Sequence, residues 1–249
     1  MSEASNYVFG IRAVLEAIHA GKEIEKILLK KGLMGDLSKE LTDLIKERGI
    51  PSQTVPIERI NRITRKNHQG ALAFISAIEY QSLENTLISV FEKGEVPLLV
   101  ILDGITDVRN LGAIARSAAC AGAHAIVVPE KGSAVVNADA IKTSAGALLE
   151  IPVCRVKNLW QAVMYLKNSG LSIVCATEKG AQDYYTCQLD GPMALVMGAE
   201  DTGITSQILR SASVNCKIPL QGKIESLNVS VAAGILLFEA VKQRKLSNN

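Results

Sequence analysis

The sequence predicts an α/β protein in two parts, with a parallel sheet of about six strands in the second part. Helix-like and strand-like segments alternate along nearly all of the 249 residues. Two runs, 98–104 and 193–198, are almost continuously apolar, which is typical of parallel strands covered on both faces. A more polar stretch, 81–96, separates the two parts. We therefore expect a small α/β domain followed by a larger parallel-sheet domain.

The small domain is expected to span residues 1–80 and to alternate helices with strands. Gly49 is expected to end its second helix, and Pro56 to stand in the first turn of its third. In chain order, the predicted elements are helix 7–20, strand 24–31, helix 36–49, strand 51–55, helix 56–63 and strand 70–80.

Residues 81–96 are expected to join the domains and to carry a short helix, and the larger domain then occupies residues 97–249. Its last helix is apolar on nearly all sides, so it requires burial against the sheet or against a partner chain. The predicted strands are 98–104, 124–129, 151–156, 171–177, 193–198 and 214–220. The predicted helices are 108–123, 137–148, 158–170, 204–211 and 229–241.

The composition is that of an ordinary globular protein, with 48% apolar and 21% charged residues. A net charge of +2 permits nucleic-acid binding without requiring it. The cysteines are scattered, with no CxxC pair, which predicts reduced thiols and no zinc site. Residues 1–10 lack the pattern of a secretory signal, and no apolar stretch is long enough to span a bilayer. We expect a cytoplasmic protein without a metal and without a membrane anchor.

Glycine and polar residues gather where three predicted strands end, at 176–180, 196–203 and 217–230. Open α/β sheets bind ligands at the carboxyl ends of their strands. In the last of these segments Ser226 and Asn228 directly precede a helix, and both residue types cap free backbone N–H groups. Taken alone, that segment is equally compatible with an ordinary strand–loop–helix connection. The chain lacks the GxGxxG and GxxxxGK[ST] patterns, which disfavours a nucleotide-binding oxidoreductase.

A basic cluster lies in the predicted small domain, after Glu58 and with no further carboxylate inside it. Its members are Arg59, Arg62, Arg65, Lys66 and His68. One interpretation is a patch that contacts nucleic-acid phosphates. The other is a solvated helix face, which charge clusters usually form. The residues themselves favour neither.

Three segments of the larger domain resemble the motifs of the SpoU family of RNA ribose methyltransferases, in the SPOUT superfamily. They are DGITDVRNLGAIARSA (103–118), ALVMGAEDTGI (194–204) and CKIPLQGKIESLNVSVAAGI (216–235). In the small domain, NYVFGIRAVLEAI (6–18) and KNHQGALAF (66–74) resemble the substrate-binding domain of the branch that methylates guanosine ribose in bacterial 23S rRNA. The resemblance covers nearly the whole chain. Val108 stands where the first motif usually has proline, which affects loop stiffness more than chemistry.

The resemblance implies a fold and a cofactor. The larger domain would contain a deep trefoil knot that holds S-adenosylmethionine (SAM), and the small domain would be an α/β domain like that of a small ribosomal protein. Carried over by position, the cofactor-binding residues are Thr177, Gly198, Ile218, Leu220 and Leu227. Without the resemblance, the three aliphatic residues among them would be interpreted as ordinary core.

The resemblance also implies methyl transfer to a ribose 2′-hydroxyl, which is a poor nucleophile until a positioned group deprotonates or orients it. Arg116 is the matching candidate, although arginine stays protonated in proteins and is a doubtful base. We expect Arg116 to bind the phosphate beside the target ribose and to orient the hydroxyl. The alternative is an ordinary residue of the helix surface. The remaining catalytic candidates are Asn110, Glu200, Ser226 and Asn228.

The implied partners are structured RNA, bound by the small domain, and a second copy of the chain, bound through the knot region and the last helix. RNA-binding candidates are Arg12, Arg62, Arg65, Lys66 and His68. The expected function is SAM-dependent 2′-O-methylation of a guanosine in 23S rRNA. The alternatives are a tRNA ribose 2′-O-methyltransferase with the same machinery, or an RNA-binding ribosome-assembly protein that has lost catalysis.

Overall fold

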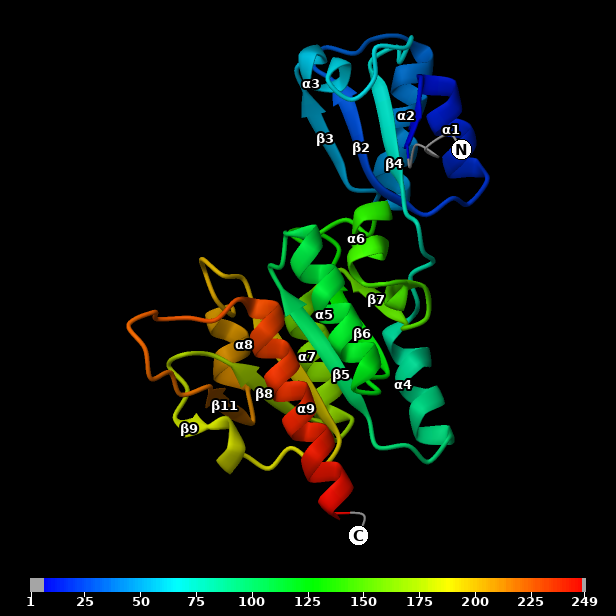
Figure 1. The fold of residues 1–249 in the computed structure, drawn as a ribbon. Coiled ribbons are helices and arrows are strands. Elements are labelled where there is room, and N and C mark those ends of the chain that lie inside the picture. The colour runs from blue at the N-terminus through cyan, green and yellow to red at the C-terminus, as the bar shows by residue number, and fades with distance from the viewer. Residues whose placement is uncertain (1–6, 248–249) are drawn as a thin grey trace. The chain divides into compact units, whose positions relative to one another are not determined.

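The computed structural model describes residues 7–247, which form two compact units (Figure 1). The first unit contains the described residues up to Glu79 together with Val135–Ala138. The second contains Tyr80–Ala134 and the described residues from Asp139 onward. Of residues 1–10, which lack a secretory signal pattern, residues 1–6 lie outside the described range. Both units are α/β, as the sequence predicts.

Within residues 7–79, a four-stranded sheet runs in the order β1-β4-β2-β3. Strand β4 is antiparallel to both β1 and β2, whereas β2 and β3 are parallel. The strands are β1 (Tyr7–Phe9), β2 (Ile24–Lys30), β3 (Ser52–Val55) and β4 (Ala71–Ile75). The helices between them are α1 (Ile11–His19), α2 (Asp36–Arg48) and α3 (Ile57–Asn61).

The first predicted helix is wrong at its start, because residues 7–9 form strand β1 and pair with β4 along their whole length. Gly10 has a φ of +94°, a left-handed conformation that glycine adopts without strain, and it turns the chain from β1 into α1. The apolar helical spacing continues across this turn, so periodicity alone does not reveal the strand.

The two faces of this sheet are covered unequally. Helices α1 and α2 pack against one face and enclose the larger apolar cluster of the unit. The five-residue helix α3 covers only part of the other face, through Ile60. Beside it, three aromatic side chains of β1 and β4 are only partly buried: Tyr7, Phe9 and Phe74.

The second unit is built on a parallel sheet whose seven strands, within residues 80–247, follow the order β7-β6-β5-β10-β8-β11-β9. Strand β9 (Gln182–Asp183) has two residues at the sheet edge, too short for a signal in the sequence. The other strands match the predicted ones: β5 (Leu98–Asp103), β6 (Ala125–Pro129), β7 (Val153–Val156), β8 (Ser172–Ala176), β10 (Met193–Gly198) and β11 (Val214–Lys217).

Helices cover both faces of this sheet, as the buried runs of β5 and β10 require. On one face, α4 (Leu83–Glu92), α7 (Leu159–Asn168) and α8 (Ser206–Ser211) share an apolar cluster with the strands. On the other face, α5 (Val108–Cys120) packs along α9 (Val229–Ser247), and α6 (Ala138–Thr143) contacts Gly112 of α5 (Figure 1). Segment 81–96, expected as a join, contains α4, so the core of the second unit begins before Pro97.

Helix α9 continues beyond its predicted end at residue 241 and is anchored near its C-terminus. The Arg244 guanidinium donates hydrogen bonds to the carbonyl oxygens of Val96 and Pro97, both at 2.8 Å, and of Gly191 at 2.7 Å. This fork ties the last helix to the segments that lead into β5 and β10. Within residues 7–247, no helix has the length and apolar character needed to cross a membrane. The trefoil knot stays a prediction.

Candidate active site

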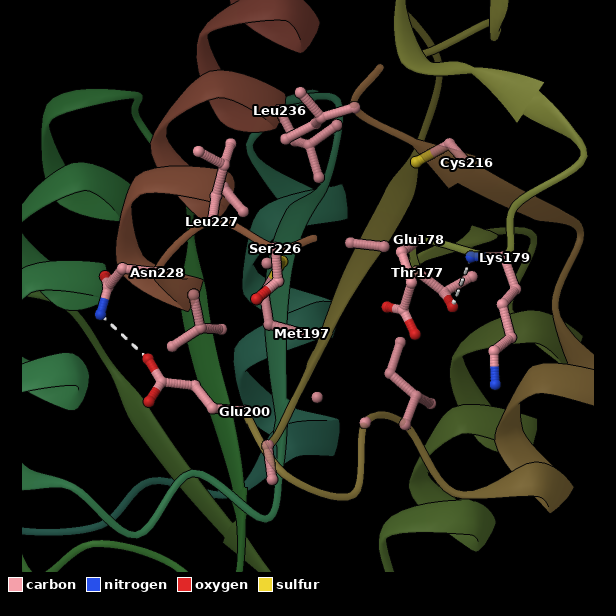
Figure 2. A pocket seen from close by; sticks show the side chains of 18 of the residues that line it. Thr177, Glu178, Lys179, Met197, Glu200, Cys216, Ser226, Leu227, Asn228 and Leu236 are labelled. Atoms are coloured by element: carbon pink, nitrogen blue, oxygen red, sulfur yellow. Dashed lines mark hydrogen bonds between the residues drawn. The ribbon is translucent and has the colours of Figure 1, made fainter. Parts of the chain in front are cut away.

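A cavity of about 450 Å³ opens at the carboxyl ends of β8, β10 and β11, where the sequence predicts a ligand site (Figure 2). This volume lies in the range of small-molecule pockets. Its floor is buried and apolar, with Met197, Cys216 and Leu236, and its mouth is formed by exposed residues of the 220–228 segment. All the cofactor candidates line the cavity: Thr177, Gly198, Ile218, Leu220 and Leu227.

One wall of the cavity is formed by the end of β10 and by the tight turn that follows Gly198. The Gly203 N–H donates to the Ala199 carbonyl at 2.9 Å. A Cβ added at Gly198 would lie 2.4 Å from the carbonyl carbon of Gly203, so only glycine fits without displacing the loop. Asp103 is 8% exposed, and its Oδ2 accepts the Thr205 N–H at 2.7 Å. The buried carboxylate therefore fixes the far end of this loop.

The opposite wall joins the ends of β8 and β11 by main-chain contacts. The Thr177 N–H donates to the Cys216 carbonyl at 2.9 Å, and the Gly180 N–H donates to the Thr177 carbonyl at 3.0 Å. A Cβ on Gly180 would approach the Cys216 carbonyl carbon to 2.5 Å. This wall consequently presents backbone groups to a ligand.

The aliphatic cofactor candidates are not ordinary core residues. Leu220 is 38% exposed and Leu227 is 37% exposed, whereas Ile218 is partly buried. All three face the cavity instead of a packed interior. The interpretation of these residues as plain core is therefore wrong.

Three catalytic candidates from distant parts of the chain meet at one side of the cavity. The Asn228 Nδ2 donates to Glu200 Oε1 at 2.9 Å and to Asn110 Oδ1 at 3.0 Å, and Asn110 Nδ2 donates to Glu200 Oε1 at 3.2 Å. Figure 2 shows the Asn228 amide turned toward Glu200, with Thr177 and Glu178 across the cavity. The three side chains close a ring of hydrogen bonds. Within residues 7–247, Glu200 Oε2 has no hydrogen-bond partner and remains open to a ligand.

Each member of this ring is placed by a local structural feature. Asn110 lies in the first turn of α5, which Asp107 caps by accepting the N–H groups of Arg109 and Asn110. Asn228 caps α9, because its Oδ1 accepts the Ser230 N–H at 2.9 Å, and this confirms the capping role predicted for it. Glu200 lies two residues beyond the end of β10. Two helix starts and one strand end thus build the ring.

The remaining catalytic candidates are placed differently. Ser226 lines the mouth of the cavity and is exposed. Arg116 lies on α5, the same helix as Asn110, but it is exposed and does not line the cavity. Within the described part of the chain, its guanidinium makes no hydrogen bond or ion pair, including none with Glu200. It is therefore free to bind an anion.

The RNA-binding candidates fall in the first unit and divide into two groups. Arg12, Arg62, Arg65 and Lys66 are exposed. His68 is 6% exposed; its Nδ1 accepts the Gly70 N–H at 3.0 Å and its Nε2 lies 2.8 Å from Asn61 Oδ1. Because Nδ1 accepts, Nε2 is the ring nitrogen that donates to Asn61. The assignment of His68 to the exposed basic patch is corrected: it supports the loop that carries the cations.

Several residues of the cavity escaped the sequence analysis. Glu178, Lys179 and Glu225 line its mouth, the first two within the 176–180 loop that the sequence singles out. Asp103 anchors the β10 loop, and a carboxylate at the end of a wholly apolar strand is the signal that would have identified it. Cys216 forms part of the floor, where burial raises the pKa of its thiol to about 12 and keeps it uncharged.

Comparisons with known proteins bear on both units. Residues 97–238 match the model of the SpoU rRNA methylase family. Residues 7–81 match the model described as RNA 2′-O ribose methyltransferase substrate binding.

Relatives match along nearly their whole lengths. The 23S rRNA (guanosine-2′-O-)-methyltransferase RlmB of Vibrio parahaemolyticus is 36% identical over 244 residues, with 97% of this chain and 98% of the relative covered. The Bacillus subtilis (strain 168) protein YacO, assigned to the TrmH family of tRNA/rRNA methyltransferases, is 33% identical over 244 residues, with 98% of each chain covered.

Solved structures agree with these matches. The AdoMet-bound rRNA methyltransferase of Sinorhizobium meliloti has a TM-score of 0.59 at 26% identity, covering 95% of this chain and 86% of its own. The TrmH/SpoU tRNA modifying enzyme of A. aeolicus has a TM-score of 0.57 at 30% identity, covering 67% of this chain and 86% of its own. The family models, the full-length relatives and the fold agree: the chain belongs to the SpoU rRNA methylase family and is a methyltransferase.

Proposed function

We propose that this protein transfers a methyl group from SAM to a ribose 2′-hydroxyl of RNA, with a guanosine of 23S rRNA as its target. The observation that carries the proposal is the ring of Asn110, Glu200 and Asn228 beside a cavity lined by all the cofactor candidates. A methyl donor in the cavity and a hydroxyl beside the ring would then be neighbours. An RNA substrate also fits the cytoplasmic location expected from the sequence.

The residues of the cavity fit SAM. An adenosyl group requires apolar walls and main-chain donors and acceptors, and the cavity offers both, through Leu220 and Leu227 and through the backbone at the ends of β8 and β11. The close approach at Gly198 leaves room only for hydrogen on that wall. When bound, SAM supplies an electrophilic methyl group. Titration calorimetry with SAM and with NAD tests the choice of cofactor. Binding heat from NAD but none from SAM would exclude SAM as the cofactor.

In this proposal, the chain's own residues hold and orient the substrate. Arg116 binds the phosphate beside the target ribose, for which an exposed and unpaired guanidinium is suited. Glu200 holds Asn110 and Asn228 in place through Oε1, and its open Oε2 faces solvent-accessible space beside the cavity. Ser226 contributes a hydroxyl at the cavity mouth, where it can donate to the RNA.

The role of Arg116 is tested by Arg116→Ala. Because this residue lies outside the cavity, SAM binding measured by calorimetry should be unchanged, whereas methyl transfer should fall by about 100-fold or more. Arg109→Ala, which removes another exposed arginine of α5, is the matched control. Unchanged turnover in Arg116→Ala would exclude the assignment.

The rRNA target rests on the Vibrio relative and on the first unit. That relative, named a 23S rRNA enzyme, spans both units, whereas the A. aeolicus tRNA modifying enzyme covers only 67% of this chain. Mass spectrometry of nucleosides from the rRNA and tRNA of a deletion strain tests the target. Loss of a 2′-O-methylguanosine from 23S rRNA is expected, and loss from tRNA alone would favour the tRNA alternative.

We also propose a homodimer that covers part of α9. Val231 is 51% exposed, Phe238 is 50% exposed and Leu246 is 66% exposed, and their spacing places them along one side of the helix. Unpaired large apolar side chains in a row favour burial against a second copy. Light scattering should give twice the chain mass of 26.7 kDa, and a monomer at micromolar concentration would contradict this.

A further inference from the structure

The first unit has an aromatic face that no part of the proposed chemistry uses. Tyr7 and Phe9 of β1 lie on the same side of the sheet as Phe74 of β4, because Tyr7 pairs directly with Phe74 and strand side chains alternate. The Tyr7 and Phe74 rings meet edge to face with centroids 6.4 Å apart, and the Tyr7 and Phe9 rings are 6.3 Å apart. Neither pair is stacked in parallel, so neither ring of a pair covers the whole π-face of the other.

This aromatic face is not closed by a helix. Helices α1 and α2 lie on the opposite side of the sheet, and α3 reaches only the part nearest β2 and β3. The three rings pack against the smaller apolar cluster and are only partly buried. The Tyr7 hydroxyl donates to the Ile63 carbonyl at 3.5 Å, so it holds the ring next to the loop that follows α3.

Two lysines lie beside the aromatic face. The Lys66 ammonium lies 5.9 Å from the centre of the Phe9 ring, and Lys26 of β2 pairs with Phe74 across the sheet. Arg62 and Arg65 are exposed on the same loop as Lys66. The sequence from residue 59 to residue 78 contains no carboxylate, so this loop carries only positive charge and β4 carries no charge. Such a surface is complementary to a polyanion with flat, stackable groups.

The loop that carries these cations is rigidly held. His68 is buried and bonded on both ring nitrogens, and the buried Thr64 accepts the Lys66 N–H at 3.3 Å. Gly70 has a φ of +83°, and a Cβ there would lie 2.8 Å from Leu33 Cδ1. The loop therefore keeps its cations beside the aromatic face instead of sampling many arrangements.

We infer that Tyr7, Phe9 and Phe74 form a stacking platform for unpaired bases of the substrate RNA, while Lys66 and its neighbours bind the adjacent phosphates. Single-stranded RNA is recognised by aromatic side chains on a sheet face next to positive charge, because every base offers a flat π-surface. Duplex RNA buries its bases and would contact only the cations. The inference rests on the proposed RNA substrate and adds which part of that RNA the first unit contacts.

The test replaces the rings without emptying the core. Phe9→Leu and Phe74→Leu keep apolar volume against Leu72 and its neighbours but remove the π-face. Each variant of the full chain should bind a short unstructured RNA about tenfold more weakly, as expected for one lost base stack, and bind a blunt-ended RNA duplex as before. Phe91→Leu on α4, where the ring is 44% exposed, is the matched control and should change neither affinity.

A second measurement uses the unaltered protein. RNA containing 5-iodouridine, irradiated in the complex, should crosslink to Tyr7, Phe9 or Phe74, as mapped by mass spectrometry. Crosslinks elsewhere only, or unchanged affinity for unstructured RNA in the Phe9→Leu/Phe74→Leu double variant, would overturn the platform. If the wild type methylates RNA and the double variant has an unchanged KM, the platform alone fails. If the wild type methylates no RNA, the proposed function fails and the platform with it.

Discussion

At the scale of single residues, Asn228 has two separate structural roles. Its Oδ1 caps α9 through the Ser230 N–H, and its Nδ2 donates to Glu200 and Asn110. The cap contributes stability, whereas the donated bonds set the geometry of the proposed active site. Because the two roles use different atoms of one amide, a substitution can remove one and keep the other.

Asn228→Ser should separate these roles. Serine caps helices about as well as asparagine, so the free energy of unfolding should change by less than about 0.5 kcal/mol. Serine cannot bridge both Asn110 and Glu200, so methyl transfer should fall by about 10- to 100-fold. Asn228→Ala should lose about 1 kcal/mol of stability in addition. Urea unfolding and single-turnover methylation measure the two effects, and equal activity of Asn228→Ser and wild type would contradict the geometric role.

Gly198→Ala should damage the cavity through a steric clash. The new Cβ would meet the backbone of Gly203 and Ile204 at 2.4 Å, which forces the β10 loop outward. We expect a loss of about 1–3 kcal/mol in stability, as for other overpacked sites, and a large loss of SAM affinity. Gly191→Ala is the control, because a Cβ at that position has nothing within 4 Å. Similar SAM affinities for the two variants by calorimetry would contradict the proposed cofactor site.

The cysteines should differ sharply in reactivity. Cys120 is exposed, whereas burial raises the pKa of both Cys175 and Cys216 to about 12. A thiol reagent at pH 8 should therefore modify Cys120 rapidly and leave the other two intact until the protein unfolds. The unfolded chain loses these two protons near pH 9, before the folded protein does. Their contribution to stability is thus present below pH 9 and lost as pH rises toward 12. Rapid labelling of Cys216 in the native protein would contradict its burial.

Residue-level features of the site were partly predictable. The glycine and polar residues at strand ends indicated the cavity because parallel strands end at one edge of a sheet. The motif resemblance supplied Asn110, Glu200 and Asn228, which lie far apart in the sequence and meet only in the fold. Burial of His68 was not predictable, because a histidine beside arginines has the same sequence pattern whether it faces solvent or the core.

At the scale of elements, α9 depends on its C-terminal anchor as well as on its cap. Arg244→Met removes a fork of charged hydrogen bonds to three carbonyl groups and should lower the free energy of unfolding by about 2 kcal/mol. Arg244→Lys keeps the charge but cannot reach all three acceptors, so it should recover only part of this loss. Lys245→Met, at an exposed neighbouring position, is the control for urea unfolding. Equal midpoints for the variants at residues 244 and 245 would show that the fork contributes nothing.

Among the elements, long periodic segments were predicted well, whereas two short strands, β1 and β9, were missed. The observed bounds of four elements agree with the predicted bounds within a residue or two: α2, α7, β5 and β10. In each of them the apolar pattern continues along the whole element, because its residues share one environment. Strand β1 was missed because its pairing partner, β4, lies more than sixty residues away. The order of the seven-stranded sheet is likewise a property of contacts that no local pattern encodes.

At the scale of the whole molecule, the two units have separate apolar cores, and the proposed SAM site lies in the second unit alone. Addition of SAM at 100 times its Kd should stabilise the second unit by about 2.7 kcal/mol. Differential scanning calorimetry should therefore show the transition of the second unit moving upward while that of the first moves little. An equal shift of both transitions with SAM would show that the units unfold as one.

Val135–Ala138, between β6 and α6, belongs to the first unit although the residues on either side belong to the second. Within the first unit, the Ala77 N–H donates to the Val136 carbonyl at 3.3 Å, and Val136 is 1% exposed. The polypeptide therefore crosses from one unit to the other three times, not once. After a protease cut near residue 80, the N-terminal fragment would still be held by non-covalent contacts with Val135–Ala138. A truncation there would instead expose the buried side chain of Val136. Chimeras that exchange RNA specificity between relatives should consequently carry this short return segment along with the N-terminal portion.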